Sequence, residues 1–93
     1  MKSLSPDELK LQLPSLPGWK LENQKLVRDW TFADFLEAMA FVNTVAELAE
    51  TAGHHPDIDI RYNKVRLGLV SHDAGGITER DVKMAKTLSN RFK

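Results

Sequence analysis

The 93-residue sequence predicts an α+β domain of two layers, in which a four-stranded antiparallel sheet from two hairpins carries three helices on one face. Helix-capping signals followed by apolar residues at helical spacing occur three times along the chain. Two segments between them alternate apolar and polar residues around a short polar turn, which is the pattern of a β-hairpin. Two hairpins separated by a helix can form one sheet whose apolar face the helices cover. At this length we expect a single domain, spanning residues 1–93.

The first helix is expected to begin after Ser5, a favourable N-cap residue that is followed by Pro6 at the first helical position. Glu8 completes a capping box with Ser5. Pro14 and Pro17 cannot continue a helix, so this helix is expected to be short.

A first hairpin is expected next. Trp19–Glu22 alternates apolar and polar side chains, as a half-buried strand does, and Lys25–Thr31 is expected to form the second strand. Asn23–Gln24 lies between the two segments and supplies the turn.

The longest helix is expected to begin with Thr31 as its N-cap, to carry Asp34 in its first turn and to end at Gly53. Its apolar residues cover a wide face, made of Phe35, Met39, Val42, Ala46 and Ala49 with an adjoining stripe of Phe41, Val45 and Leu48. Such a face is wide enough to pack against both the sheet and a second subunit. Because a chain of this size also has a modest core, we expect a homo-oligomer, most simply a dimer.

A second hairpin is expected from Ile58–Tyr62 and Val65–Val70, with the turn at Asn63–Lys64. The last helix is expected to begin after Thr78, with Asp81 completing a second capping box. Its inner face is expected to consist of Val82, Ala85, Leu88 and Phe92.

The composition excludes several classes of function. Lys and Arg together number 13, as do Asp and Glu, so the chain has no net charge to attract a nucleic acid. The absence of cysteine excludes disulfides, thiolate catalysis and cysteine metal sites. No apolar run has the length of a transmembrane segment or the form of a signal peptide, so we expect a soluble cytoplasmic protein.

All three histidines lie in one stretch, between Glu50 and Asp81. His54 and His55 follow the end of the long helix, and His72 follows the last strand. Because a hairpin returns its second strand to the start of the first, His72 is expected to lie near the other two. The sequence therefore predicts a cluster of imidazoles, which can act as general acids and bases near neutral pH.

Structural roles are the alternative for each of these residues. A pair of histidines can cap the carboxyl end of a helix, Asp81 is explained as a cap, Glu50 as helix surface and Trp19 as core. A metal site is disfavoured, since adjacent histidines chelate poorly and the HExxH spacing does not occur.

A longer motif surrounds the histidines and has the order Glu50, His54-His55-Pro56-Asp57, Tyr62-Asn63-Lys64-Val65, His72, Gly75-Gly76-Ile77-Thr78 and Asp81. This spaced string resembles the pterin-4a-carbinolamine dehydratases and covers about a third of the chain. Many members of that family carry a tryptophan where this chain has Ile58.

The resemblance implies dehydration of a 4a-hydroxytetrahydropterin to a quinonoid dihydropterin, without a metal or an organic cofactor. It implies that His54, His55 and His72 are the catalytic, pterin-contacting residues, with His55 the better candidate for the acid that protonates the hydroxyl. Glu50, Trp19 and Asp81 would be supporting residues of the substrate pocket. From its place in the capping box, Asp81 is expected to matter less for chemistry than the histidines do.

The resemblance also implies partners. Aromatic amino acid hydroxylases form the 4a-hydroxypterin when they use tetrahydrobiopterin, so the enzyme would serve the recycling of that cofactor. The family also resembles a dimerisation cofactor for a homeodomain transcription factor, and a non-catalytic binding module is therefore the alternative function.

Overall fold

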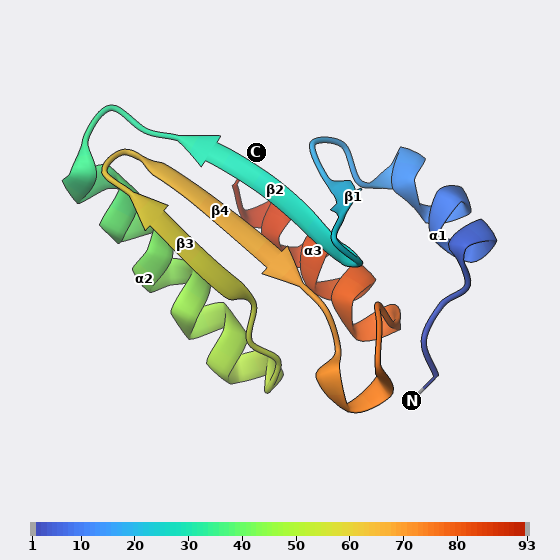
Figure 1. The fold of residues 1–93 in the computed structure, drawn as a ribbon. Helices are drawn as coiled ribbons and strands as arrows, with labels where there is room; N and C mark the ends of the chain where they lie inside the picture. Colours follow the sequence, from blue (N-terminus) through green and yellow to red (C-terminus); the bar gives the residue numbers. More distant parts are fainter. Residues whose placement is uncertain (1, 93) are drawn as a thin grey trace.

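The computed structural model describes residues 2–92 and places the elements in the predicted order (Figure 1). The helices and strands are α1 (Pro6–Gln12), β1 (Lys20–Glu22), β2 (Lys25–Thr31), α2 (Phe35–Ala52), β3 (Asp57–Arg61), β4 (Lys64–Leu69) and α3 (Glu79–Arg91). Short 3-10 turns, η1 (Leu13–Ser15) and η2 (His72–Ala74), follow α1 and β4. The predicted α+β class is confirmed. Within residues 2–92, none of the helices has the length and apolar character needed to cross a membrane.

The strands form one antiparallel sheet in the order β1-β2-β4-β3. The second hairpin therefore inserts β4 beside β2, where Leu26 pairs with Leu69, and leaves β3 at the edge. In Figure 1, α2 and α3 run behind the same face of the sheet. This topology brings the end of β4, the end of α2 and the start of α3 to one end of the molecule.

One core lies between the sheet and the helices, because alternate strand residues face the helical layer. It takes buried apolar residues from all three helices and from the inner strands, including Leu9, Leu26, Phe41, Val45, Val65, Leu67, Leu69, Val82, Ala85 and Leu88. The capping boxes of Ser5 with Glu8 and of Thr78 with Asp81 are both formed as predicted.

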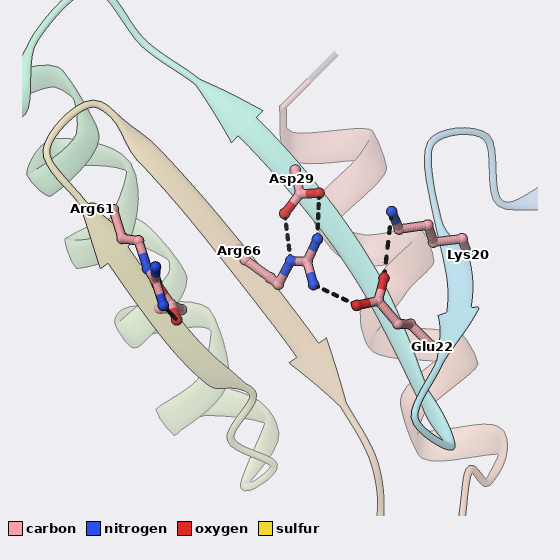
Figure 2. A network of polar contacts seen from close by, with 6 residues as sticks. Lys20, Glu22, Asp29, Arg61 and Arg66 are labelled. Carbon is pink, nitrogen blue, oxygen red and sulfur yellow. Dashed lines mark hydrogen bonds and ion pairs between the residues drawn. The ribbon is translucent and has the colours of Figure 1, made fainter.

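The other face of the sheet carries charged side chains (Figure 2). Arg66 of β4 donates two hydrogen bonds to Asp29 of β2, at 2.7 and 3.0 Å, and one to Glu22 of β1 at 2.8 Å. Lys20 approaches the same Glu22 carboxylate at 3.4 Å. Because Arg66 hydrogen-bonds to both carboxylates, it lowers the pKa of Glu22 and of Asp29 below their ordinary values.

The predicted N-cap of the long helix is wrong by three residues. Thr31 remains in β2, paired with β4, and the Phe32 N–H donates to the Asn63 carbonyl at 2.8 Å. Asp34 is the N-cap, and its carboxylate accepts from the Glu37 N–H at 2.9 Å. Thr and Asp are both favoured N-cap residues, and the pairing of Thr31 with a distant strand leaves the cap to Asp34.

The apolar face of α2 is also divided differently from the prediction. Phe41 and Val45, expected to be available to a second subunit, are 5% and 1% exposed and belong to the core. Phe35, expected on the inner stripe, is 47% exposed because the side of the helix that contains Ala38 and Ala49 faces the sheet. The expectation of an oligomer therefore depends on the small core and no longer on this face.

The turn between β3 and β4 lies one residue earlier than predicted. It consists of Tyr62 and Asn63, and Tyr62 has a φ of 55°. The Asn63 side chain donates to the Phe32 carbonyl at 2.9 Å, which ties this turn to the loop before α2. As a result β4 begins at Lys64 and ends before Val70.

Candidate active site

The end of α2 holds the first two histidines. Gly53 has a φ of 66°, which L side chains rarely adopt, and this left-handed residue ends the helix. The His54 N–H donates to the Ala49 carbonyl at 3.2 Å, so the His54 backbone is fixed against the last turn. His55 follows on the surface, and the buried Pro56 leads into β3.

The segment between β4 and α3 holds the third histidine. Ser71 and Gly76 form an isolated antiparallel bridge, with N–H to carbonyl distances of 3.0 and 3.3 Å, which closes a short loop. His72 begins the 3-10 turn inside this loop and is exposed, so it does not belong to the strand itself. Arg80 of α3 donates to Asp73 at 2.5 Å and lowers the pKa of that carboxyl.

Asp81, in the first turn of α3, joins the two segments. It is completely buried, and its Oδ2 accepts from the Thr78 N–H at 2.8 Å and from the Ser71 hydroxyl at 2.9 Å. Its Oδ1 lies 2.5 Å from Nε2 of His54, whose side chain is 12% exposed. Ser71, the residue before His72, and the side chain of His54 therefore both contact the Asp81 carboxylate.

His55 makes a second, different pair with a carboxylate. Its Nε2 contacts Oε2 of Glu50, which lies in the last turns of α2. The two side chains are 62% and 76% exposed, so solvent reaches both members of this pair. The structure thus places one histidine–aspartate pair in the interior and one histidine–glutamate pair on the surface beside it.

Trp19 lies elsewhere. It is 6% exposed, its Nε1 donates to Ser89 at 3.1 Å, and its ring stands edge-on to Trp30 with centroids 5.8 Å apart. Ser89 follows Asp81 by eight residues on α3, a rise of roughly 12 Å along the helix axis. Trp19 supports the core at the other end of α3, and its predicted contact with the substrate stays a prediction.

Two surface grooves adjoin the histidines. A groove of about 360 Å³ between α2 and α3 is lined by Leu48, Thr51, Ala52, His54, Arg80, Lys83, Met84 and Thr87. Its volume lies within the range of small-molecule sites. A second groove, of about 250 Å³, is lined by Asn23, Gln24, Lys25, Val70, His72, Gly75 and Gly76. His54 and His72 thus open onto different grooves, and their convergence on one ligand stays a prediction.

Comparison with known proteins identifies the family. The sequence model described as pterin 4 alpha carbinolamine dehydratase matches residues 2–91. The chain belongs to this family. A relative from Acidobacterium capsulatum, named after the same dehydratase, is 59% identical over 88 residues, which are 95% of this chain and 96% of the relative. Another, from Thermomicrobium roseum, is 60% identical over 77 residues, which are 83% of each chain.

Solved structures agree with this membership of the dehydratase family. A crystal structure described as a transcriptional coactivator/pterin dehydratase from Brucella melitensis has a TM-score of 0.89 and 33% identity, covering 96% of this chain and 97% of that one. A pterin dehydratase-like RuBisCO assembly factor of the alpha-carboxysome has a TM-score of 0.65 and 22% identity, covering 78% and 87% of the two chains. The second likeness shows the fold alone.

Ile58, the departure from the pattern of many dehydratases, lies on the edge strand β3 opposite Leu67 and is 39% exposed. It does not line either groove beside a histidine. Its place in the alternating strand agrees with the interpretation that isoleucine instead of tryptophan changes the packing of side chains at this edge.

Ser71 is the residue of this site that the sequence did not reveal. It is 1% exposed, and its hydroxyl contacts both Asp81 and Thr78. A lone serine after a strand carries no signal of such a role, because the contact depends on how β4 meets α3.

Proposed function

We propose that this protein dehydrates a 4a-hydroxytetrahydropterin to a quinonoid dihydropterin and water, with its histidines as general acid and base. The observation that carries the proposal is the buried Asp81 in contact with His54, beside a second, exposed histidine, in a member of the pterin-4a-carbinolamine dehydratase family. The contact between Asp81 and His54 goes beyond the helix cap, and a carboxylate that orients an imidazole supports general acid–base catalysis.

The reaction requires two proton transfers. The general acid gives a proton to the hydroxyl on carbon 4a, and the carbon–oxygen bond breaks to release water. The general base takes the proton from the neighbouring ring nitrogen, whose electron pair forms the new carbon–nitrogen double bond. No electrons leave the pterin, so the step needs no redox cofactor, and proton exchange with solvent restores both histidines.

The surroundings of each histidine favour different roles. His55 is exposed and can regain a proton from solvent after each turnover, so we assign it the acid. His54 is held by Asp81, so we assign it the base, and His72 contacts the pterin from its loop. Glu50 orients His55, while Trp19 supports the pocket only through the packing of the core.

The biological setting follows from this reaction. A hydroxylase that spends tetrahydropterin on oxygen supplies the substrate, and a reductase consumes the product, so the protein serves pterin recycling in the cytoplasm. We propose that it acts as a homodimer.

The test is turnover of a chemically generated 4a-hydroxytetrahydropterin, followed by stopped-flow absorbance with the uncatalysed rate subtracted. Replacing His54 or His55 singly by Ala should lower the rate by about 100- to 10,000-fold, as loss of a general acid or base does. Replacing His72 by Ala should lower the rate as well, through the lost contact with the pterin. Glu47→Ala, an exposed change on α2, is the control and should leave the rate unchanged. Double variants should lose far less than the product of the single losses. Wild-type turnover in three folded histidine variants would refute the proposal.

A binding role is the alternative, because the similar Brucella melitensis structure is described as both coactivator and dehydratase. The same assay separates the two functions, since a pure binding module would give only the uncatalysed rate with the wild-type chain.

A further inference from the structure

A buried polar cluster lies directly behind His54. Within residues 2–92, the polar or charged side chains in the buried class are Ser71, Thr78 and Asp81, each at most 1% exposed. All three contact one another, and Asp81 carries the contact onward to His54. Buried polar groups are costly unless they are satisfied, so a cluster in this one place calls for an explanation.

The helix cap explains only part of the cluster. The capping box of α3 needs the Thr78 hydroxyl, the Thr78 N–H and the Asp81 carboxylate. Ser71 is not part of it, since the cap already gives Oδ2 of Asp81 one donor at 2.8 Å. The Ser71 hydroxyl adds a second donor to the same oxygen at 2.9 Å.

The hydrogen bonds of the cluster run in one direction. An ionised carboxylate only accepts, so the single hydroxyl hydrogen of Ser71 points to Asp81. The Ser71 and Thr78 oxygens are 2.9 Å apart, and with the Ser71 hydrogen already used, Thr78 must be the donor of that bond. Thr78 in turn accepts from the Arg80 N–H at 3.2 Å. The chain therefore begins at a backbone N–H and ends at Asp81.

The end of this chain fixes the tautomer of His54. With two donors on Oδ2, the carboxylate keeps Oδ1 for Nε2 of His54, at 2.5 Å. An oxygen that can only accept requires a hydrogen on Nε2, and a neutral imidazole then carries its lone pair on Nδ1.

We propose that Ser71 is a positioning residue that acts through Asp81 to hold His54 as the Nε2–H tautomer, so that Nδ1 of His54 is the proton-accepting atom of the site. The catalytic consequence depends on the proposed dehydratase function, whereas the tautomer does not. The same residue also closes the loop of His72 through its backbone bridge to Gly76, which a change of side chain leaves in place.

The test compares Ser71→Ala, which removes the hydroxyl, with Ser71→Thr, which keeps it. Ser89→Ala is the matched control, because Ser89 is a partly buried hydroxyl near the other end of α3 that binds Trp19 and Arg28. The first measurement is the ¹⁵N chemical shift of both His54 ring nitrogens, followed to increasing pH until the shifts no longer change and the imidazole is neutral.

The wild-type protein, Ser71→Thr and Ser89→Ala should show a protonated Nε2 and an unprotonated Nδ1 at His54. In Ser71→Ala the two shifts should move towards each other as the second tautomer becomes populated, while those of His55 stay unchanged. Turnover of the 4a-hydroxypterin should fall roughly 10- to 100-fold in Ser71→Ala, as for the loss of a hydrogen bond to a charged group, and stay within a few-fold in the other variants.

A wild-type His54 with its hydrogen on Nδ1 would overturn the proposal, whether or not Ser71→Ala folds. A folded Ser71→Ala protein with unchanged His54 shifts and turnover would overturn it as well. Absence of wild-type turnover together with the expected shifts would instead refute the dehydratase function and leave the tautomer assignment standing.

Discussion

Asp81→Asn tests the site most directly, because it exchanges one oxygen for an NH2 group without changing the shape of the side chain. The two donors from Ser71 and Thr78 meet one carboxylate oxygen, so the remaining amide oxygen must take that place. The NH2 group then faces Nε2 of His54, where Oδ1 stood at 2.5 Å. A donor now opposes a donor, and His54 relieves the clash by moving its hydrogen from Nε2 to Nδ1.

The expected losses differ for activity and for stability. Nδ1 no longer carries a lone pair, so turnover should fall by about 100- to 10,000-fold, the range for loss of a general base. The corresponding exchange in the catalytic triad of serine proteases, which also gives the wrong histidine tautomer, costs about 10,000-fold. Thr78 remains the N-cap, and the amide oxygen can still accept from the Thr78 N–H, so the free energy of unfolding should fall by no more than about 1 kcal/mol.

The assay pairs stopped-flow turnover with chemical unfolding and uses Asp34→Asn as the control. Asp34 also caps a helix through its carboxylate, at 2.9 Å from the Glu37 nitrogen, but it caps α2 at the end away from the histidines. Asp34→Asn should change stability by a similar small amount and leave turnover unchanged. A folded Asp81→Asn protein with wild-type turnover would refute the reasoning and return Asp81 to a purely structural role.

Three further predictions concern the charged face, metals and assembly. Arg66→Gln should destabilise the protein slightly at neutral pH, because Arg66 lowers the pKa of Asp29 and Glu22. The stabilisation by these pairs is complete above the ordinary carboxyl pKa of about 4 and is lost as the pH falls through the lowered pKa values. The unfolding curves of the variant and the wild type should therefore converge in acid, and a difference that persisted there would contradict the assignment. Activity should survive exhaustive chelation, since adjacent histidines chelate poorly; a loss that zinc restores would make the histidines metal ligands. Light scattering at micromolar concentration should give about twice the 10.5 kDa of one chain, and a mass of 10.5 kDa would exclude the dimer.

The sequence predicted those features of the fold that depend on local chemistry. Ser5 and Thr78 cap their helices as expected, and Lys25–Thr31 forms a strand with the predicted bounds. Thr31 and Asp34 show the limit of such reasoning, because both are good N-caps and only the pairing of β2 with β4 assigns Thr31 to a strand. Phe41 was misplaced for a similar reason, since helical periodicity defines an apolar face but not which side of it meets the sheet.

The candidate site was predictable as residue types and only partly as contacts. The hairpin and the motif predicted that His72 lies near His54 and His55. The two segments do meet at Asp81, through Ser71 and His54, but His72 and His54 line different grooves, so their convergence on one ligand stays a prediction. Capping chemistry was a sufficient explanation for Asp81, so the sequence predicted that it matters less for chemistry than the histidines. Its second contact, with His54, could not be inferred from spacing, and this contact is the reason for the opposite prediction made above. A residue with one complete local explanation can therefore have a second contact, such as that of Asp81 with His54, which only the tertiary structure reveals.

The two histidine–carboxylate pairs differ in a way that suits the proposed division of labour. His54 and Asp81 are 12% and 0% exposed by side chain, and the Ser71–Thr78 chain fixes the carboxylate from behind. Such a histidine keeps one tautomer, which a base needs so that its lone pair always faces the same atom. His55 and Glu50 are mostly exposed, so water can renew the proton that the acid delivers in each turnover. The buried network around Asp81 therefore suits His54 as the base, and the exposed pair with Glu50 is sufficient for His55 as the acid.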